Sequence, residues 1–366
     1  MICYLPLPRF ERWGDVVDEI VQKEIDLLRS LHTLMDNPPE KPVLLMGDVI
    51  LDRYFHGWAN HLNSFAPVPV VKVTEKFESA GAAAHIARGL VNLGLNVRFF
   101  SILGGDENGQ VVAQQLHEEM VDTSDIRIAT HLQTVAKTRI YGSRESLIDR
   151  EQLILQFDEE SQESFPDSVV NKLTNSAISA LPGSCAVVLS DYGKGVISDD
   201  GAAKLIAKAR ESEVPVICDP KLTGLHRTVG ATVALFEIRG LELLRRRNNL
   251  QSAEETAAYF IDKHDWEGML VLGGEHGSTL YQKDAKPLHI PCLVEVPKQL
   301  IGLHDAAVTA LACALGDGRT LAEGARLANA ACECILAAIT DRVVLNRRKL
   351  KTRLDELSWH FQISGR

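Results

Sequence analysis

The sequence lacks a long hydrophobic run: no apolar stretch among its 366 residues reaches the roughly 20 residues that a membrane-spanning helix needs. The start of the chain also lacks the basic residues and apolar core of a secretory signal. Positive charge is scarce, since 39 Lys and Arg accompany 49 Asp and Glu and the formal net charge is -10. This balance disfavours a broad nucleic-acid surface, which needs clustered cations. We therefore expect a cytoplasmic protein that binds neither membranes nor nucleic acid.

Cysteine pairs with the spacing of a metal or redox motif are also missing. The seven cysteines form no Cys-x-x-Cys pair, their number is odd, and most lie in apolar stretches. We expect reduced, buried thiols in a reducing compartment rather than disulfides or metal ligands. The cysteines are Cys3, Cys185, Cys218, Cys292, Cys313, Cys332 and Cys334.

What the sequence does contain is an alternation of strand-like and helix-like segments. Residues 42–48 form a continuous apolar run that ends in Gly-Asp, as expected of a strand buried on both faces. Residues 13–35 have the apolar spacing of an amphipathic helix, which two prolines then end. The alternation predicts an α/β fold with a doubly wound, mostly parallel sheet flanked by helices. The further expected helices span 80–93, 109–120, 201–211 and 305–315, and the further strands span 97–103, 186–190, 214–218, 233–236 and 269–272.

Two segments interrupt this alternation. Residues 68–73 and 136–157 contain strand-like pieces that are not joined to helices in the βαβ manner. We expect them to form a small antiparallel sheet outside the main one, acting as a lid, and the alternative is an extra edge hairpin on the main sheet. No internal repeat, low-complexity segment or linker marks a second domain.

Polar residues follow the first buried strand, at the edge of the sheet where open α/β folds bind ligands. Asp48, Asp52 and Arg53 could hydrogen-bond the hydroxyl groups of a sugar, or could form only a capped turn and a surface ion pair. The small residues 81–84, which precede His85, would let a ligand approach a helix N-terminus. Close packing of that helix on the sheet would require small residues as well.

Two later strands end in similar polar loops. Asp191 and Lys194 follow strand 186–190, and could present a carboxylate to a sugar and an ammonium group to a phosphate. Asp219 and Lys221 repeat the arrangement two elements later. The alternative is that both are ordinary connections between a strand and a helix.

Two turns contain glycine. Gly302-Leu303-His304-Asp305 opens a long apolar helix, so Asp305 could accept a hydroxyl proton while backbone N–H groups stabilise a transferring phosphoryl group, or could only cap the helix. Gly273-Gly274-Glu275-His276-Gly277 could cradle phosphates or an adenine edge, or could be a tight turn. Because the histidines near these motifs lie far apart in the sequence, we do not expect a metal site.

Together these motifs resemble the PfkB, or ribokinase-like, family of sugar kinases, and within it the heptose-phosphate kinase branch. The resemblance is carried by residues 47–54, 66–73, 189–195 and 219–221. It covers roughly residues 40 to 355 and implies a ribokinase-like domain at 41–355 with lid segments at about 55–75 and 134–157. Outside the resemblance we expect a helical extension at 1–40 and a tail at 356–366.

The resemblance also implies an activity, namely ATP-dependent phosphoryl transfer to a sugar phosphate similar to heptose 7-phosphate, with Mg²⁺ and with a homodimer formed through the lid. Asp305 would be the catalytic base, and Gly302, Leu303 and His304 would form the anion hole. The implied substrate-binding residues are Asp48, Asp52, Gly81, Ala82, His85, Asp191 and Lys194. The implied nucleotide-binding residues are Lys221, Glu237, Gly274, Glu275 and Gly277, and the metal ligands stay unassigned.

Four segments depart from the family pattern. The anion hole Gly-Ala-Gly-Asp becomes Gly302-Leu303-His304-Asp305, in which two larger residues would crowd the approach of a phosphoryl group. The sugar segment ends in His85 instead of Asn, the Pro-Asn-x-x-Glu motif falls on residues 236–240 with Glu237 in place of Asn, and a Thr falls on Leu272. These changes suggest altered or lost activity.

Three hypotheses for the function stay open. The first is an active sugar kinase. The second is an inactive protein that binds a sugar phosphate, a nucleotide or a protein partner, and the third is a purely structural subunit.

Overall fold

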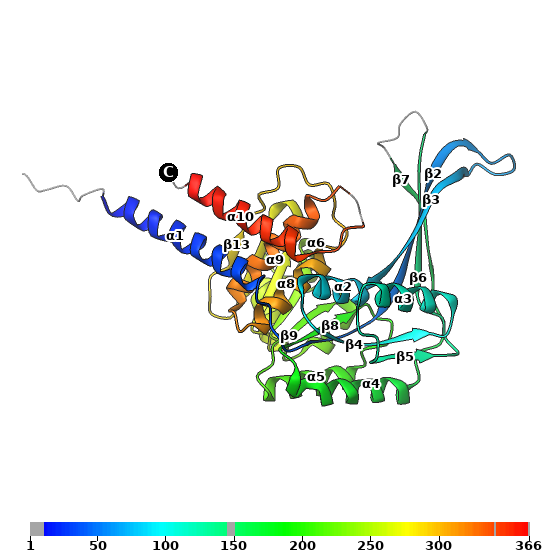
Figure 1. The fold of residues 1–366 in the computed structure, drawn as a ribbon, viewed down its shortest axis with the longest axis horizontal. Coiled ribbons are helices and arrows are strands. Elements are labelled where there is room, and N and C mark those ends of the chain that lie inside the picture. The colour runs from blue at the N-terminus through cyan, green and yellow to red at the C-terminus, as the bar shows by residue number, and fades with distance from the viewer. Residues whose placement is uncertain (1–10, 145–150, 340–341, 365–366) are drawn as a thin grey trace, which may run out of the picture.

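A nine-stranded sheet forms the centre of the computed structural model, which describes residues 11–144, 151–339 and 342–364 (Figure 1). The strand order is β13-β12-β11-β10-β9-β8-β1-β4-β5. All pairs from β11 to β5 are parallel, while β12 and β13 add antiparallel strands at one edge. The predicted α/β fold with a mostly parallel sheet is confirmed. The strands are β1 (Val43–Gly47), β4 (Val97–Gly104), β5 (Ile126–Ala129), β8 (Ala186–Asp191), β9 (Val216–Pro220), β10 (Val233–Glu237), β11 (Gly268–Leu272), β12 (Ser278–Gln282) and β13 (Leu288–Ile290).

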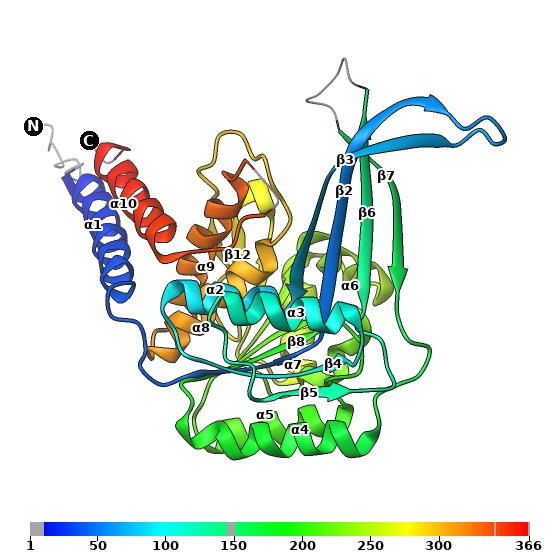
Figure 2. The same ribbon diagram turned by 45° about the vertical axis from the view of Figure 1, so that its right-hand side comes forward.

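Helices cover both faces of this sheet, and two apolar cores lie between the layers (Figure 2). Every residue of β1 and β8 is buried, as their continuous apolar runs predict for central strands of a parallel sheet. One core packs under α2 (Ala83–Leu93), α3 (Glu107–Glu118), α8 (Leu303–Gly316) and α9 (Leu321–Leu336). The other packs under α4 (Asp167–Ala180), α5 (Asp199–Glu211), α6 (Ile238–Arg247) and α7 (Ala253–His264). Short 3₁₀ turns lie at Leu181–Gly183, Leu222–Thr228 and Gly274–His276.

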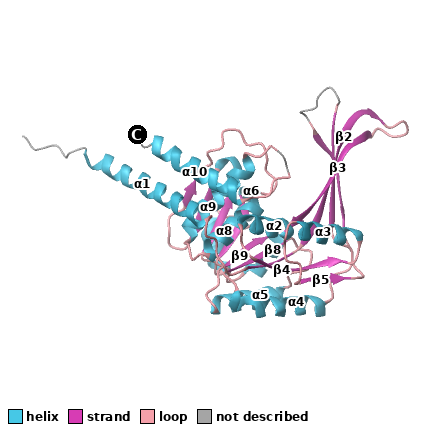
Figure 3. Ribbon diagram, in the orientation of Figure 1, coloured by secondary structure: helices cyan, strands magenta, loops and turns pink. Residues whose placement is uncertain are grey.

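A second, four-stranded sheet projects from the main body and forms the lid sheet (Figure 3). Its strands, in the order β3-β2-β6-β7, are β3 (Pro69–Ala82), β2 (Val49–Leu62), β6 (Ala136–Ser143) and β7 (Gln152–Glu159). The separate sheet was predicted, but it is mixed rather than antiparallel, because β2 and β6 run parallel. Residues 145–150 of the predicted lid segment lie outside the described residues. Since a single residue, Asp48, separates the end of β1 from the start of β2, the lid sheet extends directly from the carboxyl edge of the main sheet.

The helix boundaries follow local capping and pairing. Asp106 and Ser198 accept backbone N–H groups in the first turns of α3 and α5, so both helices begin two residues earlier than predicted. Thr320 and Glu323 form a reciprocal capping box that starts α9. By contrast, the helix predicted from residue 80 begins only at Ala83, because the preceding residues pair with β2 in the lid sheet.

The two ends of the described chain pack against each other as a pair of helices, α1 (Glu11–Leu34) and α10 (Arg347–Ser364) (Figures 1 and 2). Leu31 of α1 and Leu354 of α10 are fully buried in the core that also contains α8 and α9. Residues 356–364, which lie beyond the expected domain boundary, continue α10. The expected N-terminal extension is therefore anchored on the main body through its partner helix.

Six cysteines lie among the described residues and all are free thiols, whereas Cys3 lies outside them. Cys218, Cys313 and Cys332 are buried, and the other three are partly exposed. Within the described ranges, no helix has the length and apolar character required to span a membrane.

Candidate active site

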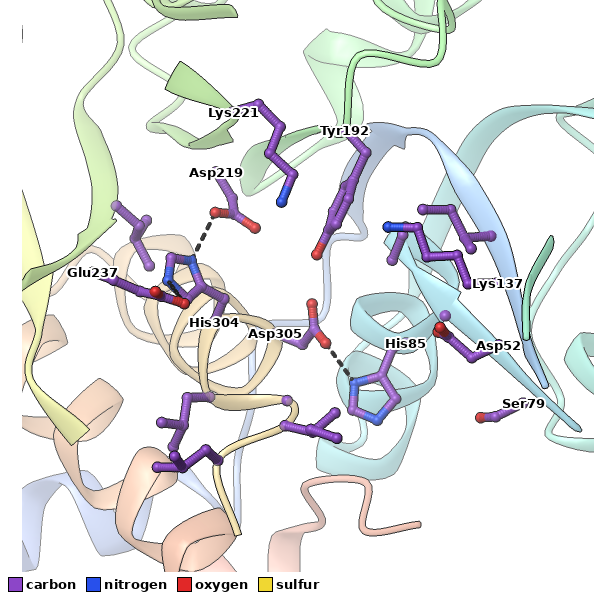
Figure 4. Close-up of a pocket in the computed structure, with 18 of the residues that line it drawn as sticks. Asp52, Ser79, His85, Lys137, Tyr192, Asp219, Lys221, Glu237, His304 and Asp305 are labelled. Atoms are coloured by element: carbon purple, nitrogen blue, oxygen red, sulfur yellow. Dashed lines mark hydrogen bonds and ion pairs between the residues drawn. The ribbon is translucent and has the colours of Figure 1, made fainter. Parts of the chain in front are cut away.

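A cavity of 680 Å³ opens at the carboxyl ends of β8, β9 and β10, between the lid sheet and the first turn of α8. Asp52 and Asp305, which are 253 positions apart in the chain, both line it. Figure 4 shows the two carboxylates on either side of His85. The fold therefore brings the first and the last of the sequence motifs to one place, as expected for ligand sites at this edge of an open α/β sheet.

Asp305 is the acid at the start of α8. Its Oδ2 atom lies 3.0 Å from Nδ1 of His85, while its Oδ1 atom is buried and has no hydrogen-bond partner among the described residues. Gly302 precedes the helix with a φ of 91°, a left-handed conformation that suits glycine, and no side chain caps the helix. The first N–H groups of α8 therefore lack intrahelical acceptors beside a carboxylate oxygen that is free to accept a proton.

Asp52 is held on the opposite wall by the lid sheet. Its Oδ1 atom accepts a hydrogen bond of 2.7 Å from Arg139 of β6, whose guanidinium also lies over the ring of Tyr54. Burial raises the pKa of the Asp52 carboxyl although Arg139 lowers it. Gly81 leaves the space for this arrangement, since a Cβ atom there would collide with the Asp52 carboxylate. Gly81 was predicted to let a ligand approach the helix, but in the structure it leaves room for the carboxylate of Asp52.

His304 bridges two carboxylates from neighbouring strands. Its Nδ1 lies 2.8 Å from Asp219 at the end of β9, and its Nε2 lies 3.5 Å from Glu237 at the end of β10. Burial would lower the pKa of His304, but Asp219, Glu237 and Asp305 together raise it to about 9. His304 is therefore an imidazolium at neutral pH, and its side chain points away from Asp305, toward β9 and β10 (Figure 4).

Two lysines point into the cavity on either side of Tyr192 (Figure 4). Lys221 lies 4.6 Å from the centre of the Tyr192 ring, and neither Lys221 nor Lys137 forms an ion pair with a described residue. Burial lowers the pKa of Lys137. Burial, followed by the nearby carboxylates, raises the pKa of the Tyr192 hydroxyl well above its usual value. The cavity thus holds two cations that are available to anionic groups of a ligand.

Sequence reasoning did not select Lys137, Arg139 or Tyr192 as site residues. Lys137 and Arg139 occupy alternate positions of β6, and side chains two residues apart share one face of a strand. That spacing is a signal in the sequence, but only the pairing of β6 with β2 shows which face meets the cavity.

Several predicted site residues lie elsewhere or are already engaged. Asp48 is fully buried outside the cavity, and its carboxylate accepts backbone N–H groups from Tyr192, Lys194 and Val196 at 2.8 to 3.0 Å. Burial raises the pKa of Asp48, and these three donors oppose the shift. Asp191 borders the cavity but is bound at 2.6 Å by Arg227.

Lys194 and the second glycine turn do not contribute to the described lining of the cavity. Lys194 forms an ion pair with Glu160. Gly277 has a φ of 79°, and a Cβ atom there would collide with the backbone of Ile290, so close chain packing explains this glycine. Gly274 and Glu275 belong to the same turn. Gly81, Ala82, His85, Lys221, Glu237 and Gly302 to Asp305 do line the cavity.

A divalent cation does not fit the residues present. The carboxylates of Asp219 and Glu237 face the imidazolium of His304, which repels a second cation. Across the described parts of the chain, no group of three or more His, Cys, Asp or Glu side chains is arranged to hold a metal ion. The Mg²⁺ that the resemblance implies therefore has no evident set of protein ligands here.

The raised pKa of His304 predicts a pH-dependent stability. Below pH 6.5 the group is protonated in the folded and unfolded chain, and its ion pairs contribute fully. Between pH 6.5 and about 9 the unfolded chain loses this proton first, so up to about 3 kcal/mol of stabilisation disappears. Urea unfolding of the wild type and of His304→Gln should show the steeper loss in the wild type. Parallel pH profiles would contradict the assignment.

Comparison with known proteins identifies the family to which the chain belongs. The family described as pfkB family carbohydrate kinase matches residues 45–341. A bifunctional protein HldE from Haemophilus influenzae is 34% identical over 298 residues, which are 81% of this chain and 60% of that protein. The HldE of Actinobacillus succinogenes is 33% identical over 304 residues, 82% of this chain and 61% of that protein. The chain thus spans about three fifths of the length of these curated relatives.

Solved structures share the fold at lower identity. Phosphofructokinase-2 from Escherichia coli, in complex with fructose-6-phosphate, matches with a TM-score of 0.69 and 16% identity over 87% of this chain and 99% of that one. The ribokinase of Arabidopsis thaliana, complexed with ribose and ATP, matches with a TM-score of 0.65 and 17% identity over 86% and 99%. These matches confirm that the architecture is ribokinase-like.

Proposed function

The chain belongs to the pfkB family of carbohydrate kinases, and from that membership we propose that it transfers the terminal phosphoryl group of ATP to a hydroxyl group of a sugar phosphate similar to heptose 7-phosphate. The observation that carries the proposal is the unpartnered, buried Oδ1 atom of Asp305, beside the uncapped first turn of α8 and inside the same cavity as Asp52. This combination supplies a proton acceptor next to backbone donors that can stabilise negative charge.

The residues of the cavity support a direct transfer. Asp305 Oδ1 would accept the proton of the sugar hydroxyl as its oxygen attacks the terminal phosphorus of ATP, and the bond from that phosphorus to ADP would break. His85 positions the Asp305 carboxylate through its contact with Oδ2. The free N–H groups of α8 would meet the charge that develops on the transferring group. Positioning and electrostatics thus account for most of the proposed catalysis.

The cations support a substrate that is itself phosphorylated. Lys137 and Arg139 lie on the lid sheet beside Asp52, whereas Lys221 lies on the opposite side of Tyr192, near Asp219 (Figure 4). Asp52 would hold the sugar hydroxyls, Lys137 the phosphate of the sugar, and Lys221 the phosphates of the nucleotide. Each of these cations meets its phosphate in a partly enclosed cavity, where charge-assisted hydrogen bonds are strong.

One observation favours a second function, an inactive protein that binds sugar phosphates or nucleotides. His304 pairs with both Asp219 and Glu237 on the proposed nucleotide side of the cavity. Among the described residues, this leaves no group of carboxylates arranged to hold a metal ion, although anionic ligands could still bind. A protein with this site could retain ligands and yet transfer no phosphoryl group.

Release of ADP separates the two functions. The protein is incubated with Mg-ATP and either heptose 7-phosphate, hexose phosphates or the matching unphosphorylated sugars, and ADP is measured with a coupled assay. We expect ADP release with the phosphorylated sugars and at least about tenfold less with the unphosphorylated ones, since these lack the contact with Lys137. Thermal stabilisation by the same ligands without ADP release would identify the inactive binding protein.

We also propose a homodimer through the outer face of the lid sheet. Tyr54 lines the cavity, and side chains alternate along a strand, so Phe55 and its cross-strand neighbours Ile140 and Leu155 lie on the opposite, outer face. Leu155 is 51% exposed and Phe157, two residues further along β7, is 42% exposed. Contiguous apolar residues on an exposed sheet face are typical of an interaction surface.

The substitution Leu155→Glu tests this dimer. It places a charge in the apolar face, and we expect the dimer dissociation constant to rise at least about tenfold, because an unpaired charge would be desolvated in the interface. The matched control is Gln156→Glu, which adds the same charge to the cavity face of the same strand. Analytical ultracentrifugation of both variants gives the answer. A monomeric wild type, or equal effects of both substitutions, would exclude the proposed surface.

A further inference from the structure

His304 occupies an unusual position between two strand ends. Both of its ring nitrogens face a carboxylate oxygen, Asp219 at 2.8 Å and Glu237 at 3.5 Å. A neutral imidazole carries a lone pair on one nitrogen, which would then point at a negative oxygen. Only Nδ1 makes a hydrogen bond, to Asp219, while Nε2 lies near Glu237 without one. Because both neighbouring groups are carboxylates, their negative charge favours the imidazolium over the neutral ring.

The imidazolium changes what the strand ends can bind. A divalent cation needs carboxylate oxygens with available lone pairs, and here one oxygen of each carboxylate, Asp219 Oδ1 and Glu237 Oε1, faces His304. Lys221 adds a second positive charge close by, and it has no ion pair with a described carboxylate. The two carboxylates are thus balanced by two fixed cations before any ion arrives, and a divalent cation would meet little net attraction.

The same charges face the place where phosphate groups would bind. His304 is the second residue of α8, and Lys221 lines the cavity in front of that helix. An anion at the start of α8 would meet the backbone N–H groups, the Lys221 ammonium group and the imidazolium together. Each of them is part of the chain, so none depends on a dissolved ion.

We propose that His304, held between Asp219 and Glu237, supplies the positive charge that a divalent cation would otherwise bring, so that this side of the cavity binds the phosphate groups of a nucleotide without a divalent cation. The inference rests on the proposed function for the choice of a nucleotide as ligand. It does not require turnover, so a protein that binds without catalysis would still satisfy it.

Titration calorimetry with ADP tests the proposal, in EDTA and in excess Mg²⁺. For the wild type we expect dissociation constants that agree within about threefold between the two conditions. His304→Gln keeps a polar side chain but removes the charge, and should bind ADP at least about tenfold more weakly in EDTA. Added Mg²⁺ should restore much of the lost affinity for ADP, because the two carboxylates are then free to attract the cation.

The matched control is His226→Gln, which removes an exposed histidine that pairs with Asp199 outside the cavity. It should change the ADP dissociation constant neither in EDTA nor in Mg²⁺.

His304→Lys provides a second variant, since it retains a positive charge and should still bind ADP in EDTA. The proposal is overturned if the wild type binds ADP only with Mg²⁺, if it binds ADP in neither condition, or if His304→Gln binds as the wild type does in EDTA. Binding that is independent of Mg²⁺ without ADP release in the sugar assay would refute the kinase and leave this inference standing. ADP release in the sugar assay together with ADP binding that requires Mg²⁺ would support the kinase and refute this inference.

Discussion

Asp305→Asn is expected to lower ADP release about 10²- to 10⁴-fold, the range that a general base contributes. The amide of asparagine has nearly the shape of the carboxylate but cannot accept the hydroxyl proton. Because no donor among the described residues is bonded to Oδ1, the substitution breaks no hydrogen bond that the structure shows at that atom. Affinity for ADP and the unfolding temperature should therefore stay close to the wild-type values. The measurements are a coupled ADP assay, calorimetry and thermal unfolding.

The matched control is Asp200→Asn, the same change in the first turn of α5, where the side chain is exposed and pairs with Lys204. Its rate should equal that of the wild type. Equal rates for Asp305→Asn and the wild type would remove Asp305 from the mechanism. A large drop in the unfolding temperature of Asp305→Asn would instead assign the residue a structural role.

Asp48→Ala should cause the largest loss of stability of the substitutions considered. It would leave the backbone N–H groups of Tyr192, Lys194 and Val196 buried without their acceptor. Each unsatisfied buried group costs about 1 to 3 kcal/mol, so for three groups we expect a total loss of about 3 to 9 kcal/mol in the free energy of unfolding. Urea unfolding measures this loss. The loop that Asp48 holds carries Tyr192 into the cavity, so ligand affinity should fall with it.

Asp48→Asn keeps one acceptor oxygen and should lose less, which makes the comparison informative even if the alanine variant does not fold. Asp200→Ala, at an exposed site, should change the free energy of unfolding by no more than about 0.5 kcal/mol. If Asp48→Ala unfolds like the wild type and only loses affinity for the sugar, Asp48 binds substrate directly and the structural role is wrong.

The fate of the two acids in the first motif shows where sequence reasoning stops. Asp48 and Asp52 are four residues apart and follow the same buried strand, so both were equally plausible sugar ligands. In the structure the Asp48 carboxylate is buried and accepts hydrogen bonds from the loop after β8. Asp52 lies near the start of β2 in the lid sheet and lines the cavity. The direction of Asp52 depends on the pairing of β2 with β3, and that of Asp48 on its contacts with the loop after β8, neither of which a local pattern specifies.

The contacts of His304 with Asp219 and Glu237 could not be predicted from the sequence either. The motif showed that histidine stands where the family has glycine, and therefore that the anion hole is altered. It did not show that Asp219, 85 positions earlier, would meet the Nδ1 atom. The expected crowding of the phosphoryl site is partly relieved, because the side chain is drawn toward the two carboxylates and away from Asp305 (Figure 4).

The sequence alone determined the layered α/β architecture, favoured a separate small sheet and indicated that a long apolar helix opens within Gly302–Asp305. These features depend on apolar periodicity, on turn-forming residues and on local capping, which act between residues near one another in the chain. Only the tertiary structure decided which carboxylates are free, which are paired, and which face of the lid sheet meets the cavity. Those outcomes depend on strand register and on contacts between distant segments, where a shift of one residue reverses the side that a side chain faces.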